Sequence, residues 1–174
     1  MRLRRLAASA AAGALAILAV PAAASASVAA SPGGWRPYHT APWTDAPGAV
    51  CSFGVAATIV YQHEQFRTLA RYPNGDPRLQ EFRGPLVVRY TNTSTGASAV
   101  RSLSGYGWFH YGAQSSIRAF VASHIGVTVP VGNAGFPAGE WVISGRSEVI
   151  VNSAGTISIR LIHATAEDLC RTLG

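Results

Sequence analysis

Most of the chain after Cys51 alternates apolar and polar residues with a period of two, which is the spacing of a β-strand with one buried face. The alternating segments are short and are separated by Gly, Asn, Ser and Pro residues that favour turns. We expect strands at residues 53–61, 66–72, 79–82, 86–90, 99–103, 106–111, 117–122, 125–131, 141–144, 148–151 and 156–163. Many short strands joined by such turns predict an all-β fold, either an antiparallel β-sandwich or a flattened barrel.

Two local signals refine the strand pattern. The apolar positions change parity between Tyr61 and Phe66, which predicts a bulge or break near residues 63–65. A helix over residues 64–71 is the competing interpretation of this stretch. Asn74-Gly75 is a common short hairpin turn, so the segments on either side of it are expected to pair.

The end of the chain has the pattern of a short helix. Thr165 is a suitable N-cap, and the acidic residues Glu167 and Asp168 would lie in the first turn, where the helix dipole favours negative charge. We therefore predict a short C-terminal helix over residues 165–173.

The first thirty residues have the layout of a secretory signal peptide. Three arginines within the first five residues precede an apolar run over residues 6–20, and small residues precede the Ala26–Ser27 bond. An uncleaved anchor is the alternative, although the alanine-rich run is weakly apolar for a span of about 20 residues. We expect a signal peptide over residues 1–26, cleavage near Ala26–Ser27, and a secreted, extracellular protein.

A segment rich in proline and glycine follows, over residues 27–50. Four prolines recur at intervals of five from Pro32 to Pro47, which predicts an irregular or polyproline-like arm. Its rings, Trp35, Tyr38 and Trp43, either dock a partner or lie on the domain and become buried. Residues 51–174 are then expected to form a single β domain.

Cys51 and Cys170 are the only two cysteines of the chain. An even pair of cysteines in an exported protein predicts a disulfide bond. This bond would join the start of the β domain to its end.

The charge pattern argues against a nucleic-acid partner. The chain has no lysine, and once the signal peptide is removed 11 arginines face 8 acidic residues. These arginines are scattered singly, whereas a nucleic-acid surface clusters its cations. We expect no nucleic-acid binding.

No catalytic, metal or cofactor constellation is evident in the sequence. The histidines are widely dispersed, and no Gly-x-Ser-x-Gly motif is present. The carboxylates near predicted elements also form no local pair apart from Glu167-Asp168. We predict no catalytic residue, no metal and no cofactor, and we place His163 at the edge of the core. The residues considered are His39, His63, His110, His124, His163, Glu64, Glu81, Glu140, Glu148, Glu167 and Asp168.

One strand carries a candidate binding surface. Tyr106, Trp108 and His110 alternate, so their side chains share one face. The alternative is an aromatic face packed against the proline-rich arm or a neighbouring sheet.

Several short motifs together resemble a group of uncharacterised secreted β-rich proteins of actinobacteria. These are Cys51-x-Phe53, RYTNTSTG at residues 89–96 followed by a strand and SGYG, the glycine-bearing hairpin near Gly155, and DLC at residues 168–170. A composition rich in Ala, Gly and Arg is typical of the same organisms. The resemblance implies a fold and a cysteine pair, and it carries no known activity.

These observations predict a secreted, non-enzymatic binding or envelope-associated module of unknown ligand, with a cell-envelope component or a small apolar ligand as the candidate partners. One alternative is a β-barrel that encloses a small apolar ligand in a cavity lined by alternating apolar side chains. A second alternative is a secreted hydrolase with a non-standard site, which requires a histidine beside an acid or a nucleophile inside a cleft.

Overall fold

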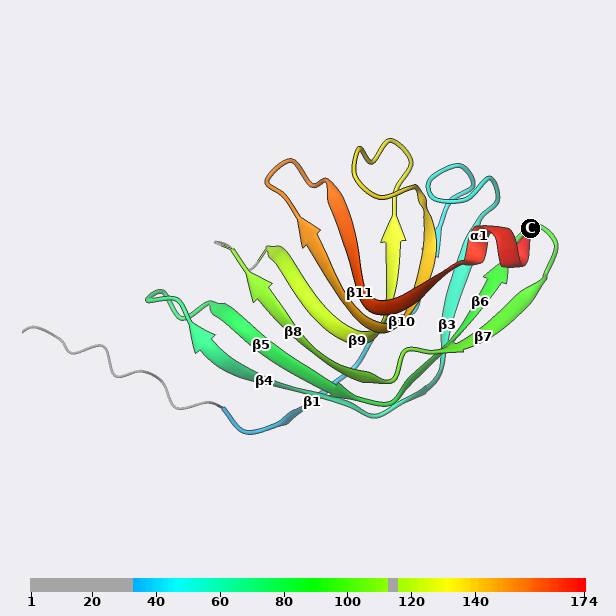
Figure 1. Ribbon diagram of the computed structural model, residues 1–174. Helices are drawn as coiled ribbons and strands as arrows, with labels where there is room; N and C mark the ends of the chain where they lie inside the picture. Colours follow the sequence, from blue (N-terminus) through cyan, green and yellow to red (C-terminus); the bar gives the residue numbers. More distant parts are fainter. Residues whose placement is uncertain (1–32, 113–115) are drawn as a thin grey trace, which may run out of the picture.

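Two antiparallel β-sheets and one short helix make up the described part of the molecule (Figure 1). The computed structural model describes residues 33–112 and 116–174. The elements are β1 (Arg36–Tyr38), β2 (Trp43–Asp45), β3 (Val55–Gln62), β4 (Glu64–Arg71), β5 (Pro77–Gly84), β6 (Leu86–Asn92), β7 (Ser98–Ser102), β8 (Gly105–Tyr111), β9 (Ile117–Val129), β10 (Gly139–Val151), β11 (Ile157–Asp168) and α1 (Leu169–Leu173). The seven-stranded sheet has the order β1-β4-β5-β8-β9-β10-β11, and the four-stranded sheet has the order β2-β3-β6-β7. The sheets are not closed into a barrel, so the prediction of an antiparallel two-sheet fold is confirmed and the flattened barrel is not formed.

The chain passes between the sheets at short breaks. His63 separates β3 from β4, and Pro85 separates β5 from β6. At this bend the His63 amide donates a hydrogen bond to the Pro85 carbonyl (2.9 Å). Gly84 has a φ of 129°, and a Cβ there would lie 2.5 Å from the His63 carbonyl oxygen, so this close approach requires glycine. The predicted break near residues 63–65 is confirmed, and β4 replaces the competing helix.

Strands β9 and β10 are longer than the sequence pattern predicted. Each was expected as two strands, but each runs unbroken over 13 residues. The pairing of β10 with β9 shifts register between Ser144 and Ser147, which marks a β-bulge. A bulge changes the parity of the apolar positions while the strand stays paired, and this explains the apparent gap.

The C-terminal helix is shorter than predicted. Thr165 is not its N-cap, because β11 stays paired with β10 as far as Asp168. Asp168 caps α1 instead, and its carboxylate accepts a hydrogen bond from the Cys170 amide (2.9 Å).

The prediction that His163 lies at the edge of the core is also wrong. This residue is exposed, and it pairs with Arg146 beside a register shift.

The proline-rich segment is not an irregular arm in its described part. Arg36–Tyr38 pairs with β4 and Trp43–Asp45 pairs with β3, so β1 and β2 form one edge of each sheet. Edge strands tolerate proline because one side of their backbone needs no ladder partner. Residues 33–50 thus belong to the same fold as the remainder of the described chain, while the predicted signal peptide and cleavage point lie outside the described residues.

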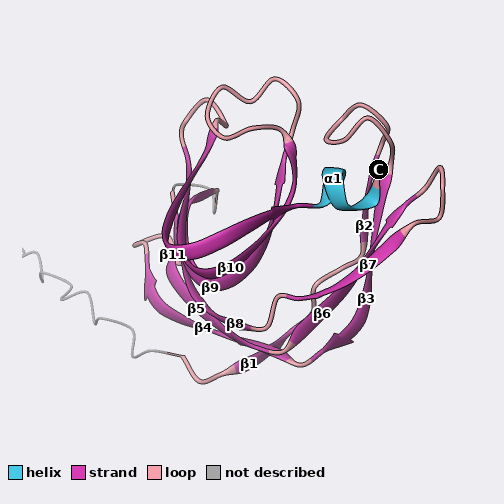
Figure 2. Cartoon of the chain, turned by 45° about the vertical axis from the view of Figure 1, so that its right-hand side comes forward, coloured by secondary structure: helices cyan, strands magenta, loops and turns pink. Residues whose placement is uncertain are grey.

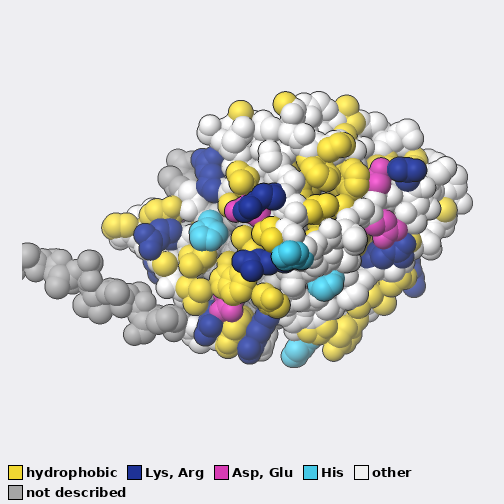
Figure 3. Space-filling view, viewed as in Figure 1, with side chains coloured by type: hydrophobic (Ala, Val, Ile, Leu, Met, Phe, Trp, Pro, Cys, Tyr) yellow, Lys and Arg dark blue, Asp and Glu magenta, His cyan; other side chains and the backbone are white. Residues whose placement is uncertain are grey.

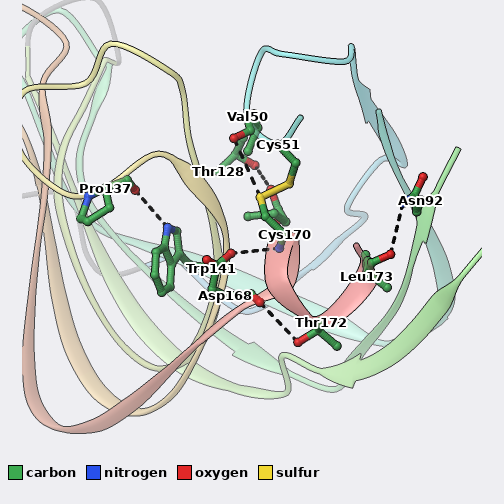
Figure 4. Close-up of a disulfide and its surroundings, with 11 residues drawn as sticks. Val50, Cys51, Asn92, Thr128, Pro137, Trp141, Asp168, Cys170, Thr172 and Leu173 are labelled. Carbon is green, nitrogen blue, oxygen red and sulfur yellow. Dashed lines mark hydrogen bonds between the residues drawn. A yellow bond between two sulfur atoms is a disulfide. The ribbon is translucent and has the colours of Figure 1, made fainter. Parts of the chain in front are cut away.

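The predicted disulfide between Cys51 and Cys170 is confirmed, with their Cα atoms 5.3 Å apart. It ties α1 to the segment before β3 (Figure 4), and Leu169 and Leu173 of this helix are buried. In Figure 1, α1 lies beyond the end of β11, over the four-stranded sheet. Within residues 33–112 and 116–174, no helix has the length and apolar character needed to cross a bilayer.

Candidate ligand groove at the sheet junction

A row of five aromatic rings crosses one face of the seven-stranded sheet. The strands β1, β4, β5, β8 and β9 each contribute one ring, and we call these residues the aromatic row: Tyr38, Phe66, Phe82, Phe109 and Phe120. Ring centroids lie 5.1 Å apart for Tyr38 and Phe82, 4.8 Å for Phe82 and Phe109, and 4.9 Å for Phe109 and Phe120. These separations are those of favourable aromatic pairs. The row is therefore one continuous apolar surface built from distant parts of the chain.

Three rings of the aromatic row line an open groove of about 260 Å³. Tyr38, Phe82 and Phe109 contribute to its wall, together with Tyr111 and Ile117. The sheet curves strongly along β4, β5, β8 and β9 (Figure 2). The groove is thus a concave surface with aromatic walls, the usual character of small-molecule sites.

The floor of the groove lies where the two sheets meet. Trp43, Leu86, Leu103 and Gly126 form it. A Cβ at Gly126 would lie 2.9 Å from the Tyr90 hydroxyl oxygen and 3.1 Å from a Leu103 methyl carbon. The absence of a side chain at Gly126 therefore lets β9 approach the four-stranded sheet closely at this point.

The polar residues that line the groove include Arg83, Thr40 and Glu64. Glu64 is half-buried and accepts a hydrogen bond from the Thr40 hydroxyl (2.7 Å), while burial raises the pKa of its carboxyl. The Tyr111 hydroxyl donates to the Gln80 amide oxygen (2.8 Å), and burial raises the pKa of Tyr111 to about 12. His124 is exposed at the edge of the groove. These groups can orient a ligand, but they form no nucleophile and base pair.

Trp108 and His110 of the surface predicted from β8 do not line the groove, whereas Tyr106 contributes to both. Tyr106 and Trp108 are in ring contact at 5.5 Å with an edge-to-face geometry, and Tyr106 is 55% exposed. His110 is exposed and Trp108 is half-buried. Because neighbouring residues of a strand point to opposite faces, Phe109 of the aromatic row lies on the reverse side.

An arginine and tryptophan cluster adjoins this surface. The guanidinium carbon of Arg83 lies 3.8 Å from the centre of the Trp35 ring, and that of Arg67 lies 4.7 Å from it. Arg83 is paired in register with Tyr106. We call Trp35, Arg67, Arg83, Tyr106 and Trp108 the outer patch.

A buried polar cluster lies between the sheets, behind the groove floor. Glu140 of β10 is fully buried, and its Oε2 atom accepts a hydrogen bond from the Thr128 hydroxyl (2.7 Å). Burial and the charge of Asp45 raise the pKa of Glu140 to about 7. Tyr90 is also fully buried, and burial and the charge of Glu140 raise its pKa. Sequence reasoning gave Glu140 no role, although an acidic residue between Gly139 and Trp141 at the start of an apolar strand is the available signal.

The hydrolase alternative required a histidine beside an acid or a nucleophile. All five histidines are exposed, and none of their rings hydrogen-bonds to a carboxylate or a hydroxyl in the described part of the chain. The described residues also hold no group of three or more His, Cys, Asp or Glu side chains that could bind a metal ion. In Figure 3 the visible arginines and histidines are spread over the surface among apolar side chains, without a continuous basic patch.

No protein-family model, curated protein or solved structure matches this chain. The resemblance to secreted actinobacterial proteins therefore stays a prediction. Any function has to be argued from the groove, the outer patch and the buried polar cluster.

Proposed function

We propose that the protein is a non-enzymatic binding protein that holds a small, mainly apolar ligand in the groove. The observation that carries this proposal is the aromatic row, because it leaves three large rings on the wall of an open cavity. Burial of apolar ligand surface against such rings contributes about 25 cal/mol for each Å² removed from water. The few polar groups around the groove would fix the orientation of the ligand.

The size of the groove limits the ligand. Sites for drug-sized molecules typically have volumes of about 300–1,000 Å³. The groove, at about 260 Å³, is slightly smaller than this range. A compact ligand with one or a few fused rings fits this volume better than a long lipid chain. The sheets leave the groove open, so the ligand would keep one side in solvent.

A fluorescent apolar dye, N-phenyl-1-naphthylamine, tests this proposal. We expect its fluorescence to rise on binding, and the Tyr38→Ala variant to weaken binding several-fold because a ring at the mouth of the groove is lost. Tyr61→Ala is the matched control, since it removes an exposed tyrosine that does not line the groove. Equal affinity of the dye for both variants, or no binding to the unaltered protein, would exclude the groove as a ligand site.

A second candidate function is attachment to a cell-envelope glycan through the outer patch. It is supported by the exposed Tyr106 ring beside Trp108 and by the two arginines held on Trp35. Aromatic faces stack on sugar rings, and guanidinium groups donate hydrogen bonds to hydroxyl and carboxylate oxygens. Co-sedimentation with purified cell walls tests this candidate: Trp35→Ala should abolish it and Tyr38→Ala should leave it unchanged.

Export to the cell exterior belongs to the same proposal. The disulfide supports it, because such bonds persist in oxidising compartments and are rare in the cytosol. The signal-peptide pattern of residues 1–26 supports it independently.

A further inference from the structure

A second cavity adjoins the groove along the aromatic row. It has a volume of about 350 Å³ and is lined by residues of β1, β4 and β5. One of these residues is Phe66, whose ring lies 6.2 Å from that of Tyr38 and 5.7 Å from that of Phe82, two rings of the groove wall. The two cavities therefore meet at a boundary of aromatic rings. We call this cavity the second hollow; its lining includes Arg36, Phe66, Arg67, Thr68, Arg71 and Gln80.

The side chain of Gln80 joins the two cavities by hydrogen bonds. Its Oε1 atom accepts from the Tyr111 hydroxyl of the groove wall (2.8 Å), and its Nε2 atom donates to the Thr68 hydroxyl oxygen in the second hollow (3.1 Å). Thr68 is paired with Gln80, as Phe66 is with Phe82. Because residues two apart in a strand share a face, these four side chains lie on one face of the sheet. The groove and the second hollow are therefore neighbours on that face.

Arg36 places a positive charge at this boundary. It is paired in register with Phe66, and it lies two residues before Tyr38 on β1, so it shares the face of the aromatic row. Its exposed side chain forms no hydrogen bond or ion pair with a described residue. The Thr68 hydroxyl accepts from Gln80 and donates to no described residue, so its proton is also free. Both groups are donors suited to an anionic oxygen.

No acidic residue compensates the charge of Arg36. All eight acidic residues of the chain lie in its described part, and none of them lines the second hollow. The acidic side chains of the flanking segments are already hydrogen-bonded: Glu64 to Thr40 (2.7 Å), Asp76 to Asn74 (2.9 Å) and Glu81 to Arg67 (2.6 Å). Arg71 donates to the neutral Gly75 carbonyl (2.7 Å). The second hollow thus keeps the positive charges of Arg36 and Arg71.

The charges along β4 give the groove a direction. Glu64, Phe66 and Thr68 follow one another on the same face of this strand. Glu64 lines the groove and is paired with Tyr38, whereas Arg36 is paired with Phe66, one step nearer the second hollow. An anionic group is therefore attracted to the Arg36 side of the aromatic row and repelled from the Glu64 side.

We infer that the ligand of the groove is an organic anion, with a compact apolar ring body on the aromatic row and a carboxylate, sulfonate or sulfate group directed into the second hollow. The Arg36 guanidinium pairs with this group, and the Thr68 hydroxyl donates to it. This inference rests on the proposed function, because the apolar body occupies the groove.

Two dyes that differ by one anionic group test the inference. N-phenyl-1-naphthylamine is neutral, and 8-anilinonaphthalene-1-sulfonate has the same rings with an added sulfonate. We compare the ratio of their dissociation constants, measured by fluorescence, between variants. Arg36→Gln should weaken binding of the sulfonate dye about fivefold, as expected for a partly exposed ion pair, and leave the neutral dye unchanged. Added salt should produce the same selective loss in the unaltered protein.

Arg89→Gln is the matched control. Arg89 is an exposed residue of β6 that lines neither cavity, so its replacement makes the same change in net charge away from the site. It should leave the ratio of dissociation constants unchanged. An equal loss in both variants, or an unchanged ratio in Arg36→Gln, would overturn the role of Arg36.

Amide shift mapping on the unaltered protein tests the same placement without a substitution. The sulfonate dye should shift the amides of Arg36 and Thr68 more than the neutral dye does, and equal shifts would contradict the inference even if Arg36→Gln failed to fold. Binding of both dyes with no such difference would refute the anionic group and leave the groove as a ligand site. Absence of binding by either dye would refute the proposed function and the inference together.

Discussion

Replacing Glu140 by glutamine should make the stability of the protein much less sensitive to pH. The substitution keeps the shape of the side chain and the acceptor for the Thr128 hydroxyl, but it removes the ionisable group. In the folded protein the Glu140 pKa is about 7, against an ordinary value of 4.5. The unfolded chain therefore releases this proton at lower pH than the folded chain does, and folding is disfavoured once the pH exceeds the ordinary value.

The magnitude follows from the difference between these two pKa values. At about 1.36 kcal/mol per pH unit, the difference corresponds to about 3 kcal/mol of folding free energy. The contribution is present below about pH 4.5, falls as the pH rises, and is lost above about pH 7. For a domain with a stability of about 5–15 kcal/mol, this is a large fraction of the total.

Urea unfolding followed by circular dichroism, with the disulfide intact, measures the effect at about pH 5 and about pH 8.5. At each pH we subtract the free energy of unfolding of the unaltered protein from that of Glu140→Gln. We expect this difference to be up to about 3 kcal/mol more positive at the higher pH than at the lower one. Comparing the difference at two pH values cancels any pH-independent effect of the amide. A difference that is the same at both pH values would contradict this prediction, because burial of Glu140 would then have no effect on its proton affinity.

Three further predictions follow from the fold. Reduction of the disulfide should add two hydrogens to the mass of the chain, and thiols that alkylate without a reductant would contradict the bond. Replacing Cys51 and Cys170 by serine should lower the free energy of unfolding, measured in urea, by up to about 5 kcal/mol. Gly126→Ala should destabilise the protein by about 1–3 kcal/mol in the same assay, because the new methyl group has no room, whereas Gly34→Ala, with no atom within 4 Å, should have no effect. Protein recovered from the medium of the producing cells should begin at Ser27 by terminal sequencing, and an intact leader would exclude cleavage.

Much of the strand pattern could be predicted from local sequence. Alternation placed the strands from Val55 to Tyr111 within a few residues, and Asn74-Gly75 correctly marked the hairpin between β4 and β5. The bend at His63 was visible as a change of parity. These features depend on neighbouring residues, so they can be recognised in a single sequence.

Features that depend on pairing between distant segments could not be predicted in this way. The helix predicted from Thr165 onward does not begin there, because β11 stays paired with β10 as far as Asp168. A local propensity cannot show such pairing between segments. The proline-rich segment gave no strand signal, yet β1 and β2 form because each has a neighbouring strand to join.

The groove shows the same limit. Sequence reasoning singled out Tyr106, Trp108 and His110 because they alternate within one strand. The aromatic row takes a single ring from each of five strands, so no spacing along the chain reveals it. The charge interaction of Asp45 with Glu140 also spans the two sheets and has no local signature.

We propose above that the groove along the aromatic row binds a small apolar ligand. Amide shift mapping with N-phenyl-1-naphthylamine tests it most directly, because each strand reports separately. We predict that the largest changes occur around Phe82 and Phe109 and at Gly126, and that they saturate with increasing dye. Changes confined to Trp35, Arg67 and Trp108, which do not line the groove, or no saturable change at all, would contradict the proposal.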